Sequence, residues 1–237
     1  MTDPAIFAAL EKTWPAERCL RVGPWNIREG KGGGQRVSAT TLEQDRYPFD
    51  VTEAEQAMRD LGQVPLFMVR DQDIALDADL SARGYILHDP VVIYATRCAD
   101  LIEPVPDPLT GFAHWPPLAI TADLWLAGGI GPERLQVMDR VLLTKAAVLG
   151  RIDDRPSGVA FVAVDQTTAV LHALYVPVEH RGRGAGEAML RHATIWAIEQ
   201  HAERLVLAVT KANGPARALY HRLGLQQVGQ YHYRMAP

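Results

Sequence analysis

Hydrophobic and polar residues alternate along this chain with two different periods, and the changes of period divide it into helices and strands. Residues 52–62 and 77–85 have the 3.6-residue spacing of amphipathic helices. The period of two predicts strands at residues 24–30, 35–41, 65–70 and 89–96. The sequence Gly-Lys-Gly-Gly-Gly at residues 30–34 is predicted to be the turn of a hairpin between the first two strands.

The second half of the chain shows the same alternation of helices and strands. Two short helices are predicted within residues 119–142, the second with Pro132 in its first turn. The later elements are predicted as strands at 145–152, 158–164 and 169–176 with a turn at 155–158, a helix at 184–200, a strand at 204–210, a helix at 215–224 and a strand at 226–235. Both halves therefore end in the order helix, strand, helix, strand, which indicates a weak internal repeat.

A proline-rich segment separates the two halves. Five prolines fall within residues 99–117 and interrupt every periodicity there. The chain is therefore interpreted as a domain over residues 1–100, a linker over residues 101–117 and a second domain over residues 118–237. The predicted fold class is α/β, with two tandem modules that each consist of a mixed β-sheet flanked by helices.

Composition and charge exclude several classes of protein. The 237 residues are 48% hydrophobic and 22% charged, which is typical of a soluble globular chain able to bury a core. The net charge of -4 and the scattered arginines argue against nucleic acid as a partner. Cys19 and Cys98 stand alone, so neither a metal site nor a disulfide framework is expected. The N-terminus carries an acidic residue where a signal peptide would be basic, and no apolar run approaches a membrane span, so we expect a cytoplasmic protein with no membrane partner. We expect it to be a monomer or a homodimer.

The segment with the clearest chemistry is the glycine loop at residues 181–186, Arg-Gly-Arg-Gly-Ala-Gly. It lies between a predicted strand and a predicted helix, where backbone N–H groups and the positive end of the helix dipole favour a phosphate. The spacing of its glycines differs from that of the P-loop and from that of the dinucleotide fingerprint.

The loop resembles the R-x-x-G-x-G motif of the GNAT family of acetyl-CoA-dependent N-acetyltransferases. The resemblance also covers the strand ending at Val176 and a later helix that begins after Asn213 and contains Tyr220, and it extends over about residues 118–237. It implies that the main chain of Leu174, Tyr175 and Val176 pairs with the pantetheine arm of acetyl-CoA. It further implies that the pyrophosphate is held by Arg181, Gly182, Arg183, Gly184, Ala185 and Gly186.

The resemblance also assigns roles outside the loop. Asn213 contacts the cofactor in the family, although an asparagine in this position is equally expected to cap a helix. Tyr220 would protonate the departing thiolate. The first half has no second R-x-x-G-x-G, and its segment 42–50 has no glycine and carries three acidic residues, so it resembles a degenerate GNAT copy.

The general base is less well defined. His172 lies near the middle of the expected cofactor strand, and a neutral imidazole could accept the proton of the attacking amine. The alternative is a histidine whose ring is satisfied inside the sheet. Glu179 is the next candidate, although a solvated carboxylate is expected at that place.

The resulting hypothesis is an N-acetyltransferase that moves an acetyl group from acetyl-CoA to a primary amine of a small molecule, by direct attack in a ternary complex. Acetyl-CoA is the cosubstrate and no metal is required. Two alternatives remain at this stage. The chain could acetylate a lysine or the N-terminus of a protein, or it could bind acyl-CoA without catalysis.

Overall fold

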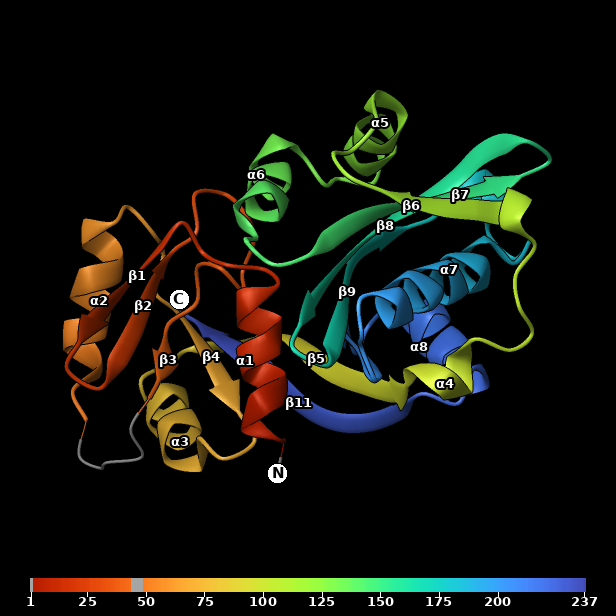
Figure 1. Ribbon diagram of the computed structural model, residues 1–237. Coiled ribbons are helices and arrows are strands. Elements are labelled where there is room, and N and C mark those ends of the chain that lie inside the picture. Colours follow the sequence, from red (N-terminus) through yellow and green to blue (C-terminus); the bar gives the residue numbers. More distant parts are fainter. Residues whose placement is uncertain (1, 44–48) are drawn as a thin grey trace.

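The computed structural model describes residues 2–43 and 49–237 (Figure 1). The helices are α1 (Pro4–Lys12), α2 (Val51–Asp60), α3 (Ile74–Ala82), α4 (Cys98–Leu101), α5 (Ala119–Ala127), α6 (Pro132–Arg140), α7 (Ala185–Glu199) and α8 (Gly214–Arg222), with short 3-10 turns η1 (Pro108–Thr110) and η2 (Val178–His180). The strands are β1 (Arg18–Val22), β2 (Trp25–Glu29), β3 (Thr41–Leu42), β4 (Leu66–Arg70), β5 (Ile86–Arg97), β6 (Gly111–His114), β7 (Lys145–Ile152), β8 (Arg155–Asp165), β9 (Thr168–Tyr175), β10 (Arg204–Thr210) and β11 (Gln226–Met235).

Several helices begin at residues whose side chains satisfy the free N–H groups of the first turn. Asp3 accepts a hydrogen bond from the N–H of Ala5 at the start of α1, and Asp50 accepts one from Thr52 at the start of α2. Asn213 does the same for α8, where its side chain accepts from the N–H of Ala216 at 3.2 Å. The capping function expected for Asn213 is therefore present.

Eight strands form one mixed sheet in the order β4-β11-β5-β10-β9-β8-β7-β6, and β1, β2 and β3 form a separate small sheet. The pair β9 and β10 is parallel, whereas its neighbouring pairs are antiparallel. Helices cover both faces: α7 packs on β6 to β9, and α1 and α5 pack on β8 and β9 (Figure 1). The predicted α/β class with a mixed sheet flanked by helices is confirmed.

The two halves share this sheet by exchanging their last strands. The order strand, helix, strand occurs twice, as β4-α3-β5 and as β10-α8-β11. β5 nevertheless pairs with β10 and β11, and β11 pairs with β4, so the final strand of each half completes the sheet of the other. Ile93 of β5 lies opposite Ala208 of β10 on one side and Gly229 of β11 on the other.

The hydrophobic core is continuous across this exchange. Leu205 and Leu207 of β10 pack in a cluster with Tyr94 of β5 on the face covered by α7 and α8. Val206 of β10 and Ile93 of β5 point to the opposite face and pack with α1. Buried residues on both faces are expected for central strands of a sheet covered by helices on both sides.

Two local predictions at turns are wrong. The segment 30–34 is not a hairpin turn, because the hairpin is formed by β1 and β2. Gly33 packs closely on α6 instead, since an added Cβ there would lie 2.5 Å from Val137 Cγ2. The turn between β7 and β8 is formed by Asp153 and Asp154, both with positive φ, rather than by residues 155–158. Aspartate tolerates the left-handed conformation through its short polar side chain, so this turn carries no glycine.

Residues 101–117 are not without regular structure. They contain η1 and the strand β6, whose residues Gly111 to His114 pair antiparallel with Gly150 to Ala147 of β7. A four-residue strand among prolines gives no detectable periodicity, and it forms because it covers the otherwise unpaired edge of β7. Residues 44–48, most of the acidic segment named above, lie outside the described residues. Within the described ranges, no helix has the length and apolar character that a membrane crossing requires.

Candidate active site

The strand β9 separates from β10 halfway along its length. Their parallel pairing ends with Leu171 opposite Leu207. Ala173 then has φ of 50°, and the register between β8 and β9 shifts at this point. Trp125 of α5 donates a hydrogen bond of 2.9 Å to the carbonyl of Ala173. This bulge turns the following residues of β9 away from β10 and leaves a notch between the two strands.

The loop after β9 is shaped by glycines with positive φ. Gly182 has φ of 72° and Gly184 has φ of 88°, and Gly184 is the N-cap of α7. No side chain caps this helix, so its first N–H groups stay available for an anion. A Cβ at either glycine would meet no atom within 4 Å, which means that these glycines are required by the backbone conformation and leave open space beside it.

A cleft of about 590 Å³ runs along β9, the loop and the start of α8. Gly186 lets the start of α7 lie close to α8 beside this cleft, because an added Cβ there would lie 3.2 Å from Leu219. Nine of the predicted cofactor residues line this cleft together: Leu174, Tyr175, Val176, Arg181, Gly182, Gly184, Ala185, Gly186 and Asn213.

The two loop arginines lie in different surroundings. Nε of Arg181 donates a hydrogen bond of 3.0 Å to the carbonyl of Val176, which ties the loop to the end of β9. Arg183 instead forms an ion pair of 2.6 Å with Asp153 in the turn between β7 and β8, and it does not line the cleft. The ion pair of Arg183 therefore links the loop to the turn between β7 and β8.

Tyr220 is buried beneath the cleft. Its side chain is 5% exposed and its ring lies 5.7 Å from the ring of Tyr94 on the exchanged strand β5. Burial, with a smaller contribution from Tyr94, raises the pKa of Tyr220 to about 12. The phenol is therefore protonated at neutral pH, as a proton donor must be. The residues that line the cleft include its neighbour Leu219 but not Tyr220 itself.

His172 lies on the other side of the notch, and both of its ring nitrogens are engaged. Nδ1 is 2.9 Å from Nη2 of Arg36, which can only donate, and Nε2 is 2.9 Å from Oγ1 of Thr13. The Thr13 hydroxyl donates to the carbonyl of Ala9, so it accepts the proton on Nε2. Burial and the charge of Arg36 hold the pKa of His172 well below its usual value.

These contacts favour a structural role for His172, with its ring satisfied inside the sheet, over the role of general base. A base needs a free lone pair, and the only lone pair of His172 faces a guanidinium. Thr13 and Arg36 could not be identified from the sequence, because they lie 159 and 136 residues away from His172 and carry no motif.

A second cleft of about 400 Å³ is lined by residues of β9 and β10 that precede those of the first cleft along the chain. It is bordered by His172 and Ala173 of β9 and by Ala208 to Thr210 of β10, whereas the first cleft continues from Leu174 and Asn213 onward. Its walls come from both halves of the chain, including Trp14, Gly33, Gly34 and Tyr231. A group held in the first cleft and a group held in the second would meet where β9 and β10 separate.

Comparison with known proteins agrees with this geometry. Residues 132–225 match the model of the family described as the acetyltransferase (GNAT) family. Over 232 residues, 94% of both chains, the protein is 27% identical to the uncharacterized N-acetyltransferase YobR of Bacillus subtilis. A stretch of 50 residues is 44% identical to the streptothricin acetyltransferase of Streptomyces lavendulae and covers 21% of this chain and 26% of that protein.

Similar solved structures extend over both halves. A GCN5-related N-acetyltransferase from Kribbella flavida has a TM-score of 0.74 and 20% identity, and the match covers 98% of this chain and 95% of that chain. A tandem GNAT protein from the clavulanic acid biosynthesis pathway has a TM-score of 0.62 and 13% identity, with 94% and 84% covered. At these identities the likeness concerns the fold, and it confirms the predicted tandem arrangement.

Proposed function

The chain belongs to the GNAT acetyltransferase family through its C-terminal half, and we propose that this N-acetyltransferase acetylates a primary amine of a small molecule. Membership of the family implies acetyl-CoA as the cosubstrate.

The observation that carries the proposal is the position of the glycine loop at the uncapped N-terminus of α7, directly beside the separated end of β9. Free N–H groups, the helix dipole and the open space next to Gly182 and Gly184 suit the pyrophosphate of acetyl-CoA. Main-chain groups of Leu174 to Val176 that no longer face β10 suit the amides of the pantetheine arm. Bound there, acetyl-CoA would supply an activated acetyl thioester at the notch.

The chain itself orients the reactants and supplies a proton. Tyr220 is the proposed proton donor for the leaving thiol. With a pKa of about 12 it holds its proton firmly, so transfer requires a thiolate that is itself poorly solvated in the buried notch. His172 is proposed to position the end of β9 through Arg36 and Thr13. The proton that the amine loses on attack passes to solvent in the second cleft, the proposed acceptor cleft.

A small acceptor is supported by two observations. The second cleft has the volume of a site for a small molecule, and it is bordered by buried aromatic and aliphatic side chains. The partial likeness to an enzyme named streptothricin acetyltransferase points in the same direction.

The residues that line the two clefts suggest a different role for each half of the chain. We place cofactor binding in residues 118–237 and assign to residues 1–100 the walls of the acceptor cleft, through Trp14, Arg36 and Asp89. Residues 101–117 connect the two and add β6 to the sheet.

The test is a screen of primary amines with acetyl-CoA, in which release of free thiol and the mass of the product are measured. Saturable thiol release with an N-acetylated product is expected for at least one small amine. Acetylation of lysines or N-termini in proteins, with no small amine accepted, would contradict the proposal.

A further inference from the structure

The acceptor cleft carries more positive than negative charge. The ionised side chains that line it are Arg36, Arg134 and Asp89. Asp89 is 46% exposed and its nearest ionic contact is His88, at 3.6 Å. Two guanidiniums therefore face the cleft against one carboxylate at its solvent side.

Neither guanidinium is matched by a carboxylate within the described part of the chain. Arg134 is half-buried on α6, and its side chain forms no hydrogen bond or ion pair with any described residue. Arg36 uses one bond, from Nη2 to His172, while its Nε is buried without a partner. A buried donor without an acceptor destabilises the fold, so a ligand that supplies an acceptor to Arg36 would stabilise it.

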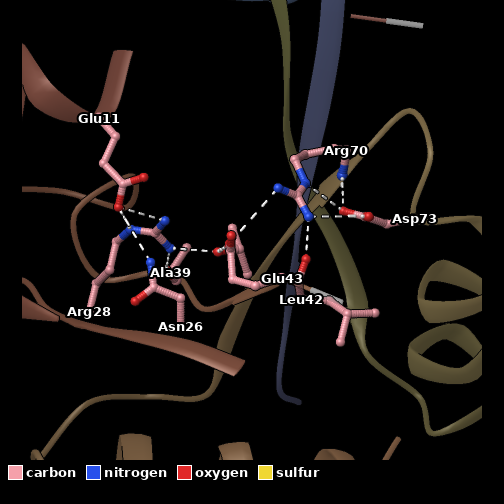
Figure 2. A network of polar contacts seen from close by, with 9 residues as sticks. Glu11, Asn26, Arg28, Ala39, Leu42, Glu43, Arg70 and Asp73 are labelled. Atoms are coloured by element: carbon pink, nitrogen blue, oxygen red, sulfur yellow. Dashed lines mark hydrogen bonds and ion pairs between the residues drawn. The ribbon is translucent and has the colours of Figure 1, made fainter. Parts of the chain in front are cut away.

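Neighbouring arginines of the first half show how this protein satisfies a guanidinium that has only a structural role (Figure 2). Nε of Arg28 donates to Glu11 at 3.0 Å, and its Nη1 donates to the carbonyl of Ala39 at 2.9 Å. Nε of Arg70 donates to Asp73 at 3.0 Å. Arg36 and Arg134 differ from both in that no carboxylate accompanies them.

The backbone leaves room for Arg134 beside the cleft. Gly34 has φ of 105°, and a Cβ there would lie 3.5 Å from both Nε and Nη2 of Arg134. The glycine segment at residues 30–34 thus lies against the guanidinium of Arg134. Val91, Ile130 and Tyr233 add apolar surface to the lining of the cleft, and the guanidinium of Arg36 lies over the ring of Trp14 at 5.9 Å.

We propose that the acceptor is an amine that also carries an anionic group, a carboxylate or a phosphate, which Arg134 and Arg36 bind while an apolar body packs on the apolar residues that line the cleft. This inference rests on the proposed function and narrows it to one class of acceptor. Arginine suits the task because its planar fork binds such oxyanions through two parallel hydrogen bonds. A polycationic acceptor is disfavoured, since its charges would meet unmatched guanidiniums.

The test uses pairs of probes that differ only in the anionic group. N-acetyltyrosine and N-acetyltyramine are titrated calorimetrically into protein saturated with CoA, and tyrosine and tyramine are compared as acceptors in the thiol-release assay. We expect the carboxylate member to bind roughly tenfold or more tightly than its partner. O-phosphoethanolamine and ethanolamine form the second pair and decide between carboxylate and phosphate.

Arg134→Gln and Arg36→Gln are compared with Arg140→Gln. Arg140 lies on the same helix but is paired with Glu17 at 2.8 Å, so the control removes the same charge away from the cleft. The preference for the anionic probe is expected to disappear in Arg134→Gln and to persist in Arg140→Gln. Arg36→Gln removes the second guanidinium of the cleft and provides a second measurement.

The outcomes separate this inference from the proposed function. Selective binding of an anionic probe without acetyl transfer to any amine overturns the proposed function and supports the inference. Transfer restricted to uncharged or cationic amines supports the proposed function and overturns the inference. Absence of binding by both anionic probes, or a preference that survives Arg134→Gln and Arg36→Gln, also overturns it.

Discussion

Nη2 of Arg36 donates a hydrogen bond of 2.9 Å to Nδ1 of His172, and this contact joins the two halves of the chain at the notch between β9 and β10. It fixes the tautomer of His172 and places a positive charge beside the imidazole. The same contact explains why a histidine in the middle of β9 is held neutral, and it leads to a prediction about pH.

Stability should fall with decreasing pH because of His172. The pKa of His172 in the folded protein lies well below the value of 6.5 that it has when unfolded. Between these two values the unfolded chain binds a proton that the folded protein does not, so stability is lost as the pH falls below about 6.5, by up to about 1.4 kcal/mol per pH unit. His172→Asn should show a shallower slope in chemical denaturation measured across this range.

The control for this experiment is His201→Asn, since His201 is exposed at the end of α7. It should keep the slope of the wild type. The dependence of kcat/KM on pH should keep its shape in His172→Asn if the residue only positions β9. Loss of the acidic limb in that variant would show instead that His172 is the general base.

The glycine loop can be tested by adding a carboxylate. Gly184→Asp should raise the dissociation constant of acetyl-CoA by roughly tenfold or more, because the new side chain caps the free N–H groups of α7 and repels the pyrophosphate. Gly62→Asp is the matched control: Gly62 also has positive φ with no atom near its missing Cβ, but it lies at the end of α2. If the two folded variants bind acetyl-CoA with equal affinity, the loop is not part of the cofactor site.

The role of Tyr220 can be separated from its packing. Tyr220→Phe keeps the ring against Tyr94 and removes only the hydroxyl, so turnover should fall by roughly 100-fold to 10,000-fold while the affinity for acetyl-CoA changes little. Tyr94→Phe is the control, since it removes the neighbouring phenol from the same buried contact. If both variants lose the same modest amount of activity, Tyr220 acts through packing alone.

The exchanged strands predict that the C-terminal half is not independent. Deleting residues 1–97 removes β5, so β10 and β11 both lose a paired neighbour at the centre of the sheet. The remaining chain should aggregate when expressed alone, because unpaired edges and buried apolar faces become exposed. Co-expression of residues 1–97 and 98–237 as separate chains should restore a soluble complex. A soluble fragment 98–237 that binds acetyl-CoA would contradict this prediction.

One acetyl-CoA should bind per chain. In the described part of the first half, no glycine loop joins a separated strand to the start of a helix as the loop at Gly184 does, and β4 leads to α3 through a short turn at Arg70 to Asp73. Isothermal titration measures the stoichiometry directly. Two equivalents per chain would show a second site in the first half.

The sequence by itself determined the features that depend on neighbouring residues. The helix and strand periods, the caps at Asp50 and Asn213, and the glycines that need positive φ at residues 182 and 184 are all set within a few positions of the chain. The proposed cofactor loop could be identified as a candidate for the same reason, since a phosphate site at a helix N-terminus is built from consecutive backbone groups.

Only the tertiary structure decided which distant elements meet. The alternating pattern of β5 would suit a strand in either half, and nothing in it specifies that Ile93 pairs with Ala208 rather than within its own half. The short strand β6 and the packing of Gly33 on α6 likewise depend on partners far away in the sequence. Arg36 and Arg134 became recognisable as candidates only when the fold placed both in the lining of the second cleft without an ion pair to a carboxylate, because whether a charge is paired is a property of its surroundings and is not encoded in its neighbours along the chain.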